Sequence, residues 1–194
     1  LFWAAFKNTG QICIATKRMY VHKDVYEPLK DALVAYAKTV KMGDGADQGT
    51  QMGPIQNKLQ YQRVLDLIED AKANGYRFLI GGETSEAPGY FVPVTIIDNP
   101  PEDSRIVQEE QFAPVLPLLK LDDVDEVIGR ANASDYGLGG SVWSADEDKA
   151  RNREIAENEA ERQTTGDVRV STWAIAVAVI IGLAAVGWVL LHNN

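Results

Sequence analysis

The chain has 194 residues, of which 45% are hydrophobic and 24% are charged, and its formal net charge is −9. An acidic chain offers no basic footprint for nucleic acid, so a nucleic-acid-binding function is not expected. Its single cysteine excludes a disulfide or a thiolate metal cluster within one chain, and two well-separated histidines, His22 and His192, argue against a histidine-rich metal site.

The first half of the chain is expected to contain two amphipathic helices after the segment that bears Cys13, which is itself expected to turn into a helix. Asp24 followed by Glu27 is typical of a capping box, and Asn57 and Gly75 are typical of a helix start and a helix end. Apolar residues recur at helical spacing in both segments. They are Val25, Leu29, Leu33 and Tyr36 in the first, and Tyr61, Val64, Leu65, Ile68 and Ala71 in the second.

Short apolar runs between these segments predict strands. The expected strands are Phe78–Ile80, Tyr90–Ile97, Val115–Leu121 and Gly139–Trp143, with a helix over Asp123–Ala131 before the last of them. Strands that alternate with helices of this length favour an α/β fold with a largely parallel sheet and flanking helices. We place this region at residues 1–150.

The end of the chain has a different composition. Residues 151–172 are expected to form a charged helical connector, and the run Trp173–Leu191 contains no charged residue. As a helix this run is about 28 Å long, close to the hydrocarbon thickness of a bilayer. The sequence therefore predicts a C-terminal transmembrane helix rather than a buried core helix. Arg162 and Arg169 precede the run and no Lys or Arg follows it, which predicts a cytoplasmic N-terminal part.

Cys13 is the strongest candidate for a chemical role. A lone cysteine is usually a small buried hydrophobe, but a thiol near a helix N-terminus gains thiolate character, and a thiolate can attack a carbonyl carbon. Phe6 to Arg18 reads Phe-Lys-Asn-Thr-Gly-Gln-Ile-Cys-Ile-Ala-Thr-Lys-Arg. This segment resembles the active-site cysteine signature of the aldehyde dehydrogenase superfamily.

Further motifs follow in the order of that family, so the resemblance extends over residues 2–150. They are Gly53-Pro54-Ile55, Gly81-Gly82, Gly89-Tyr90-Phe91, Glu109-Glu110-Gln111-Phe112-Ala113-Pro114-Val115, Ala131-Asn132-Ala133-Ser134-Asp135-Tyr136-Gly137-Leu138 and Ser141-Val142-Trp143. Ala113 stands where the family more commonly has Gly.

The resemblance implies the NAD- or NADP-dependent oxidation of an aldehyde to a carboxylic acid. Cys13 matches the nucleophile that forms a thiohemiacetal and then a thioester, and its backbone N–H matches one oxyanion donor. Glu110 matches the residue that binds the nicotinamide ribose, and Phe112 matches an aromatic residue packed near it. Without the resemblance, Glu110 and its neighbour Glu109 are a solvated turn pair. Lys7 and Arg18 are expected to be surface or helix-end charges.

The resemblance also implies parts that the chain lacks. The family's dinucleotide-binding domain, its general-base Glu and its oxyanion Asn precede the cysteine motif and do not fit into residues 1–6. After Ala150 the family's closing Gly-x-Val-x-Val-Asn segment is replaced. The sequence therefore predicts a catalytic-domain fragment that is inactive alone and prone to oligomerise through exposed apolar surface. The alternatives are a tail-anchored, non-catalytic interaction protein derived from this fold and a misjoined fusion product.

Overall fold

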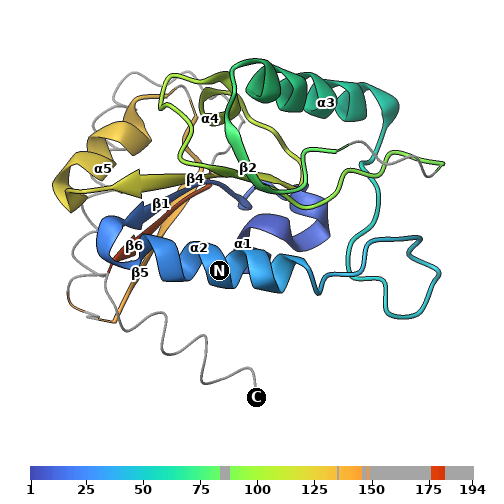
Figure 1. The fold of residues 1–194 in the computed structure, drawn as a ribbon, viewed down its shortest axis with the longest axis horizontal. Coiled ribbons are helices and arrows are strands. Elements are labelled where there is room, and N and C mark those ends of the chain that lie inside the picture. Colours follow the sequence, from blue (N-terminus) through green and yellow to red (C-terminus); the bar gives the residue numbers. More distant parts are fainter. Residues whose placement is uncertain (84–87, 135, 146–147, 149–175, 182–194) are drawn as a thin grey trace.

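A six-stranded, mostly parallel sheet organises the molecule (Figure 1). The computed structural model describes residues 1–83, 88–134, 136–145, 148 and 176–181. Strand order is β2-β3-β4-β1-β6-β5; every neighbouring pair is parallel except β2 and β3, which are antiparallel. The α/β fold with a largely parallel sheet is thus confirmed. The strands are β1 (Thr16–His22), β2 (Arg77–Ile80), β3 (Thr95–Asp98), β4 (Val115–Leu121), β5 (Gly139–Ser144) and β6 (Ala176–Ile181).

Helices cover both faces of this sheet (Figure 1). On one face lie α1 (Phe2–Phe6) and α2 (Lys23–Ala37), and on the other lie α3 (Lys58–Ala73), α4 (Arg105–Gln108) and α5 (Val124–Asn132). Successive strand residues point to opposite faces. In β1, Met19 and Val21 join the cluster under α1 and α2, whereas Tyr20 joins the cluster under α3 to α5.

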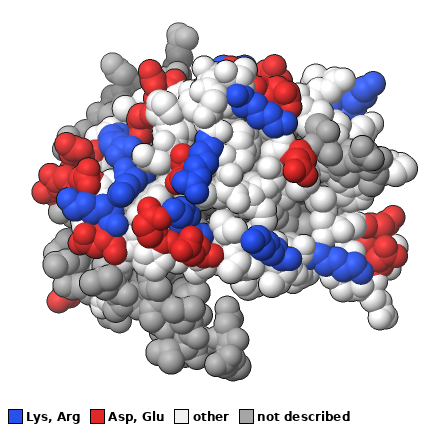
Figure 2. Space-filling view, in the orientation of Figure 1, with Lys and Arg blue, Asp and Glu red and all other residues white. Residues whose placement is uncertain are grey.

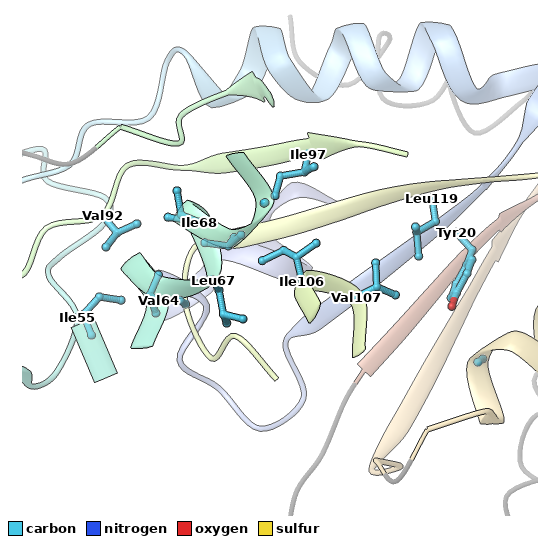
Figure 3. Close-up of a cluster of buried hydrophobic side chains, with 14 of the residues drawn as sticks. Tyr20, Ile55, Val64, Leu67, Ile68, Val92, Ile97, Ile106, Val107 and Leu119 are labelled. Atoms are coloured by element: carbon cyan, nitrogen blue, oxygen red, sulfur yellow. The ribbon is translucent and has the colours of Figure 1, made fainter. Parts of the chain in front are cut away.

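The apolar cluster on the α3 face is continuous from the helix to the central strands. Figure 3 shows side chains of α3 and α4 meeting those of β3 and β4. Its labelled members are Tyr20, Ile55, Val64, Leu67, Ile68, Val92, Ile97, Ile106, Val107 and Leu119. Leu67 belongs to the buried stripe of α3, while Leu65, which the sequence placed there, is only half-buried.

The two long helices begin in different ways. Asn57 caps α3 as predicted, since its side chain accepts a hydrogen bond from the Gln60 amide at 2.9 Å. The capping box expected at Asp24 and Glu27 is wrong. His22 is the N-cap residue of α2 and accepts from the Asp24 amide through Nδ1, while Glu27 pairs with Lys30.

The helix expected after Cys13 is also wrong, because the chain turns there into the central strand β1. Two consecutive charged residues, Lys17 and Arg18, mask this strand in the sequence, and both are buried at 1% exposure. Arg18 is therefore not a surface charge, and its guanidinium donates to the Ala131 carbonyl at 2.9 Å. Lys7 is exposed as expected.

The apolar C-terminal run contributes a strand where the sequence predicts a transmembrane helix. Ala176–Ile181 forms β6, which lies between β1 and β5 and pairs in parallel with both. The expected helix is therefore not supported at these positions, because they are extended. The rest of the run, residues 173–175 and 182–191, and the connector 151–172 lie outside the described residues. Among the helices that are described, none has the length and apolarity to cross a membrane.

Charged side chains of both signs are interspersed on the face shown in Figure 2. Ion pairs that link separate segments of the chain include Lys23 with Asp122, Arg77 with Asp98, and Arg105 with Asp66. Such exposed pairs each contribute at most about 1 kcal/mol to folding. They leave the two apolar clusters as the main source of stability.

Candidate active site

Cys13 lies in an exposed turn between η1 (Lys7–Gly10) and β1. The turn is closed by a hydrogen bond from the Ala15 amide to the Ile12 carbonyl at 2.9 Å. Among the described residues, no acceptor pairs with the backbone N–H of Cys13. The site thus presents a thiol and a free amide donor at the same position, at the N-terminal edge of the central strand.

The backbone before Cys13 has an uncommon conformation. Asn8, Thr9 and Gly10 have φ values of 51°, 59° and 70°, which lie in the left-handed region that side-chain-bearing residues rarely adopt. Hydrogen bonds hold this stretch: the side-chain amide of Asn8 donates to the Gln11 carbonyl at 3.1 Å, and the Thr9 hydroxyl donates to the Gly53 carbonyl at 3.1 Å. We refer to residues 7–15 as the cysteine loop.

Gln11 ties the cysteine loop to a second motif that the sequence singled out. Its side-chain amide donates to the Pro54 carbonyl at 3.3 Å, and its side-chain oxygen accepts from the Gln56 amide at 2.9 Å. Residues 53–56 therefore support the loop from one side. The side chains of Asn8, Thr9 and Gln11 in the motif therefore each make a hydrogen bond that holds the cysteine loop.

Gly10 brings the cysteine loop against the Glu-Glu-Gln-Phe-Ala segment. A Cβ atom at Gly10 would lie 2.2 Å from the carbonyl oxygen of Ala113, so only glycine fits. Ala113 itself is buried and is absent from the described residues with positive φ. The alanine at this position is accommodated because its backbone does not require the left-handed region. The structure thus brings two motifs that are 100 residues apart into direct contact.

Helix α3 supports the segment that carries Phe112, which has a φ of 45°. The Gln60 side chain, in the first turn of α3, donates to the Gln111 carbonyl at 2.7 Å. Gln111 is fully buried and donates to the Ile106 carbonyl, which links the segment to α4. The backbone next to Phe112 is therefore held by contacts with both α3 and α4.

The two adjacent glutamates differ in their surroundings. Glu109 accepts from the Arg105 guanidinium at 2.6 Å and is part of a surface ion-pair group. Glu110 is half-buried and, among the described residues, makes no hydrogen bond; the nearby charges are those of Lys17 and Arg63. Burial raises the pKa of Glu110, and the two cations oppose that rise. Glu110 is thus the member of the pair with free acceptor oxygens.

Lys17 lies between the two motifs and was not predicted to be a site residue. Its ammonium donates to the Gly10 carbonyl and sits 5.5 Å from the centre of the Phe112 ring. Burial lowers its pKa to about 8, and the Glu110 carboxylate counteracts this effect. Nothing in the sequence marks this lysine, because only the alternation of β1 directs its side chain inward.

The predicted site residues therefore come from two segments that are in contact. Cys13 lies on the cysteine loop, whereas Glu110 and Phe112 lie on the segment packed against it. Gly10 contacts Ala113 between the two segments, and Lys17 contacts both of them. Within the part of the chain that the structure describes, no group of three or more His, Cys, Asp or Glu side chains could hold a metal ion. An exposed thiol on one of the two segments suits nucleophilic chemistry.

The chain is similar to a known protein family over most of its length. Residues 1–182 match the aldehyde dehydrogenase family. A probable aldehyde dehydrogenase of Pseudomonas sp is 50% identical over 137 residues, which are 71% of this chain and 28% of that protein. The mitochondrial aldehyde dehydrogenase of Leishmania tarentolae is 41% identical over 86% of this chain and 32% of its own length. The chain thus spans less than a third of these relatives.

Solved structures agree with this match. The NAD+ complex of aldehyde dehydrogenase from Bacillus cereus superposes with a TM-score of 0.75 at 35% identity, over 94% of this chain and 35% of that one. A 3,6-anhydro-L-galactose dehydrogenase in complex with NAP superposes with a TM-score of 0.76 at 31% identity, over 94% of this chain and 36% of that one. The shared part includes the strand β6 region, since the family match continues to residue 182.

Proposed function

The chain belongs to the aldehyde dehydrogenase family, and we propose that it supplies the nucleophile and part of the nicotinamide site for the oxidation of an aldehyde to a carboxylic acid. The observation that carries the proposal is the free backbone N–H of Cys13, which lies at the same turn as an exposed thiol. Acyl-transfer sites need this combination of a nucleophile and an oxyanion donor.

The chain's own residues perform the acylation chemistry in this proposal. The Cys13 thiolate adds to the aldehyde carbon, and the carbonyl oxygen becomes an oxyanion that accepts from the Cys13 N–H. Loss of hydride from the resulting thiohemiacetal carbon leaves a thioester on Sγ. Water then cleaves the C–S bond, which releases the carboxylic acid and regenerates the thiol. In these reaction steps the left-handed backbone of residues 8–10 positions the turn that bears Cys13.

The residues present fit the nicotinamide half of the cofactor. Glu110 offers carboxylate oxygens without a hydrogen-bond donor among the described residues, and ribose hydroxyls are donors that such oxygens accept. Phe112 presents an aromatic ring held on a fixed backbone. When bound, oxidised NAD or NADP supplies the hydride acceptor. Glu110 and Phe112 would orient the nicotinamide riboside beside Cys13.

A chimera tests this proposal. Residues 1–145 replace the matching segment of the Bacillus cereus enzyme, whose remaining part supplies the cofactor domain. We expect aldehyde-dependent NADH formation that falls by about three orders of magnitude in Cys13→Ser, because a serine hydroxyl is a far weaker nucleophile than a thiolate. A folded chimera that binds NAD+ but shows no aldehyde oxidation, or one that keeps its rate in Cys13→Ser, would overturn the proposal.

We expect the chain alone to show negligible NADH formation with aldehydes, because it spans less than a third of its relatives' length. A high rate from the purified chain would contradict this fragment hypothesis. If Cys13 is inert in the chimera as well, the alternative of a non-catalytic interaction protein is favoured, and sequencing the transcript across residues 150–172 tests for a misjoined product.

Attachment to a membrane through Trp173–Leu191, with the N-terminal part cytoplasmic, is a separate proposal that rests on the uncharged run. It competes with β6, since residues 176–181 cannot be both a strand of the sheet and part of a membrane-spanning helix. Carbonate extraction of cell membranes decides between them. Retention in the membrane fraction would support the anchor, and release would count against it.

A further inference from the structure

Lys17 is a charged side chain enclosed by the site rather than exposed on it. It lies on the central strand β1, four residues after Cys13, and is 1% exposed. A buried ammonium is costly unless hydrogen bonds and opposite charges stabilise it. The contacts that stabilise Lys17 therefore indicate what holds it in place and what it acts on.

Those contacts reach both segments of the site. The ammonium donates to the Gly10 carbonyl on the cysteine loop, and it lies 5.5 Å from the centre of the Phe112 ring on the other segment. The negative charge of Glu110 raises the pKa of the Lys17 ammonium and so opposes the effect of burial. The Lys17 side chain thus contacts the cysteine loop and the Phe112 ring, and its charge interacts with that of the Glu110 carboxylate.

Charged groups from separate parts of the chain act on Glu110. The charges of Lys17 on β1 and Arg63 on α3 lower its pKa, while Glu109 precedes it in the chain. Glu109 is held by Arg105, and Arg63 lies 4.0 Å from Glu109 and is half exposed to solvent. Lys17 is therefore the buried cation of this group, and buried charges interact more strongly than solvent-screened ones.

We propose that Lys17 is a positioning residue, which fastens the Glu110–Phe112 segment to the cysteine loop through Gly10 and Phe112 and whose positive charge favours the acceptor form of the Glu110 carboxylate. The value of that acceptor to the reaction rests on the proposed function, in which Glu110 binds ribose hydroxyls. A protonated carboxyl would have one acceptor oxygen fewer and would donate instead. Burial favours the neutral form of the Glu110 carboxyl, and a nearby positive charge opposes this effect.

The test follows the titration of Glu110 by carbon-13 NMR of its side-chain carboxyl in the full chain. Lys17→Met removes the ammonium at nearly constant volume, Lys17→Arg keeps the charge, and Lys30→Met is the matched control. Lys30 is also buried and also lies over an aromatic ring, that of Tyr26 at 5.8 Å, but it pairs with Glu27 on α2.

We expect the Glu110 midpoint to rise by about one pH unit in Lys17→Met, the shift typical of losing a nearby opposite charge. It should return to its original value in Lys17→Arg and stay unchanged in Lys30→Met. A merely structural lysine would lower stability without moving this midpoint. An unchanged midpoint in folded Lys17→Met overturns the proposal.

A reciprocal variant covers the case in which Lys17→Met does not fold. Glu110→Gln removes the partner charge, and the midpoint of the Lys17 ammonium should then fall; an unchanged Lys17 midpoint would also overturn the proposal. Neither titration depends on turnover. If the Glu110 midpoint moves as expected but the chimera with residues 1–145 is inactive, the positioning role stands and the proposed function fails.

Discussion

The cysteine loop and strand β6 show two ways in which a segment acquires its conformation. The loop is fixed by contacts that need particular residues: glycine at position 10 against Ala113, and Gln11 between Pro54 and Gln56. Strand β6 is a stretch of small and β-branched apolar residues that meets β1 and β5 through its backbone. Its composition is equally suited to a helix in a membrane.

A spaced motif therefore specifies more about local structure than an apolar composition does. A motif that includes a Gly, an amide and a Cys at set spacing describes a local backbone and its neighbours. An apolar run describes only an environment without water, and pairing partners elsewhere in the chain decide whether it becomes helix or strand.

The largest expected effect is at Gly10. Gly10→Ala combines a left-handed φ with a clash against the Ala113 carbonyl, and we expect it to lower the free energy of unfolding by about 4 kcal/mol. The matched control is Gly49→Ala, where φ is 82° but nothing lies within 4 Å of the added Cβ, so that only about 1 kcal/mol of backbone strain is expected. Urea unfolding measures both. Equal losses would mean that the contact with Ala113 does not form.

Strand β6 is tested by a proline. Val179 pairs with Tyr20 of β1 and Val142 of β5, so Val179→Pro removes a backbone donor inside the sheet and should cost about 3 kcal/mol in the free energy of unfolding. Val179→Thr keeps the donor and serves as the control. If the run lies in a membrane instead, the proline leaves the unfolding of the remaining chain unchanged.

The burial of Lys17 predicts a pH dependence. Its pKa is lowered from 10.5 to about 8 in the folded chain, so between these values the unfolded chain binds more protons. The free energy of unfolding should therefore rise with pH across this window, by about 3 kcal/mol relative to Lys17→Met, and this gain should be lost again as pH falls from 10.5 to 8. The comparison with the variant is needed because Tyr20 and Tyr26, whose pKa values burial raises, oppose the trend at alkaline pH. Parallel curves for the chain and the variant would contradict the buried ammonium.

The smallest effect concerns the support of Phe112 by α3. Asn57→Ala removes the cap from the helix that carries Gln60, and we expect a loss of about 1 kcal/mol in the free energy of unfolding. Asn57→Asp is the control, because it keeps a side-chain oxygen that can accept from the Gln60 amide. Thermal unfolding compares the two, and an equal loss in Asn57→Asp would exclude a specific role for the capping hydrogen bond.

The sequence predicted most of the sheet and the helices because their periodicity is local. β4, β5, α3 and α5 were predicted within one or two residues, and Asn57 and Gly75 were placed correctly at the ends of α3. Strand β1 was missed because Lys17 and Arg18 are charged, and their burial depends on Glu110 and the Ala131 carbonyl, which are far away in sequence. Long-range partners of this kind leave no local pattern.

The candidate site was predicted in its residues but not in its connections. Cys13, Glu110 and Phe112 follow from the motifs, whereas the contact between Gly10 and Ala113 and the role of Lys17 required the folded arrangement. The capping residues predicted for α2 were also wrong, since the side chain of His22, not that of Asp24, accepts the hydrogen bond in the first turn. A local motif identifies candidate chemistry, and packing decides which neighbours modulate it.

The central claim is that Cys13 is the residue that becomes acylated. The chimera with residues 1–145 is mixed rapidly with benzaldehyde and NAD+, quenched in acid at early times, digested, and analysed by mass spectrometry. The account predicts a benzoyl group on the peptide that contains Cys13, formed only when NAD+ is present. A benzoyl group on another residue, or NADH formed while the Cys13 peptide stays unmodified at every time point, would contradict it.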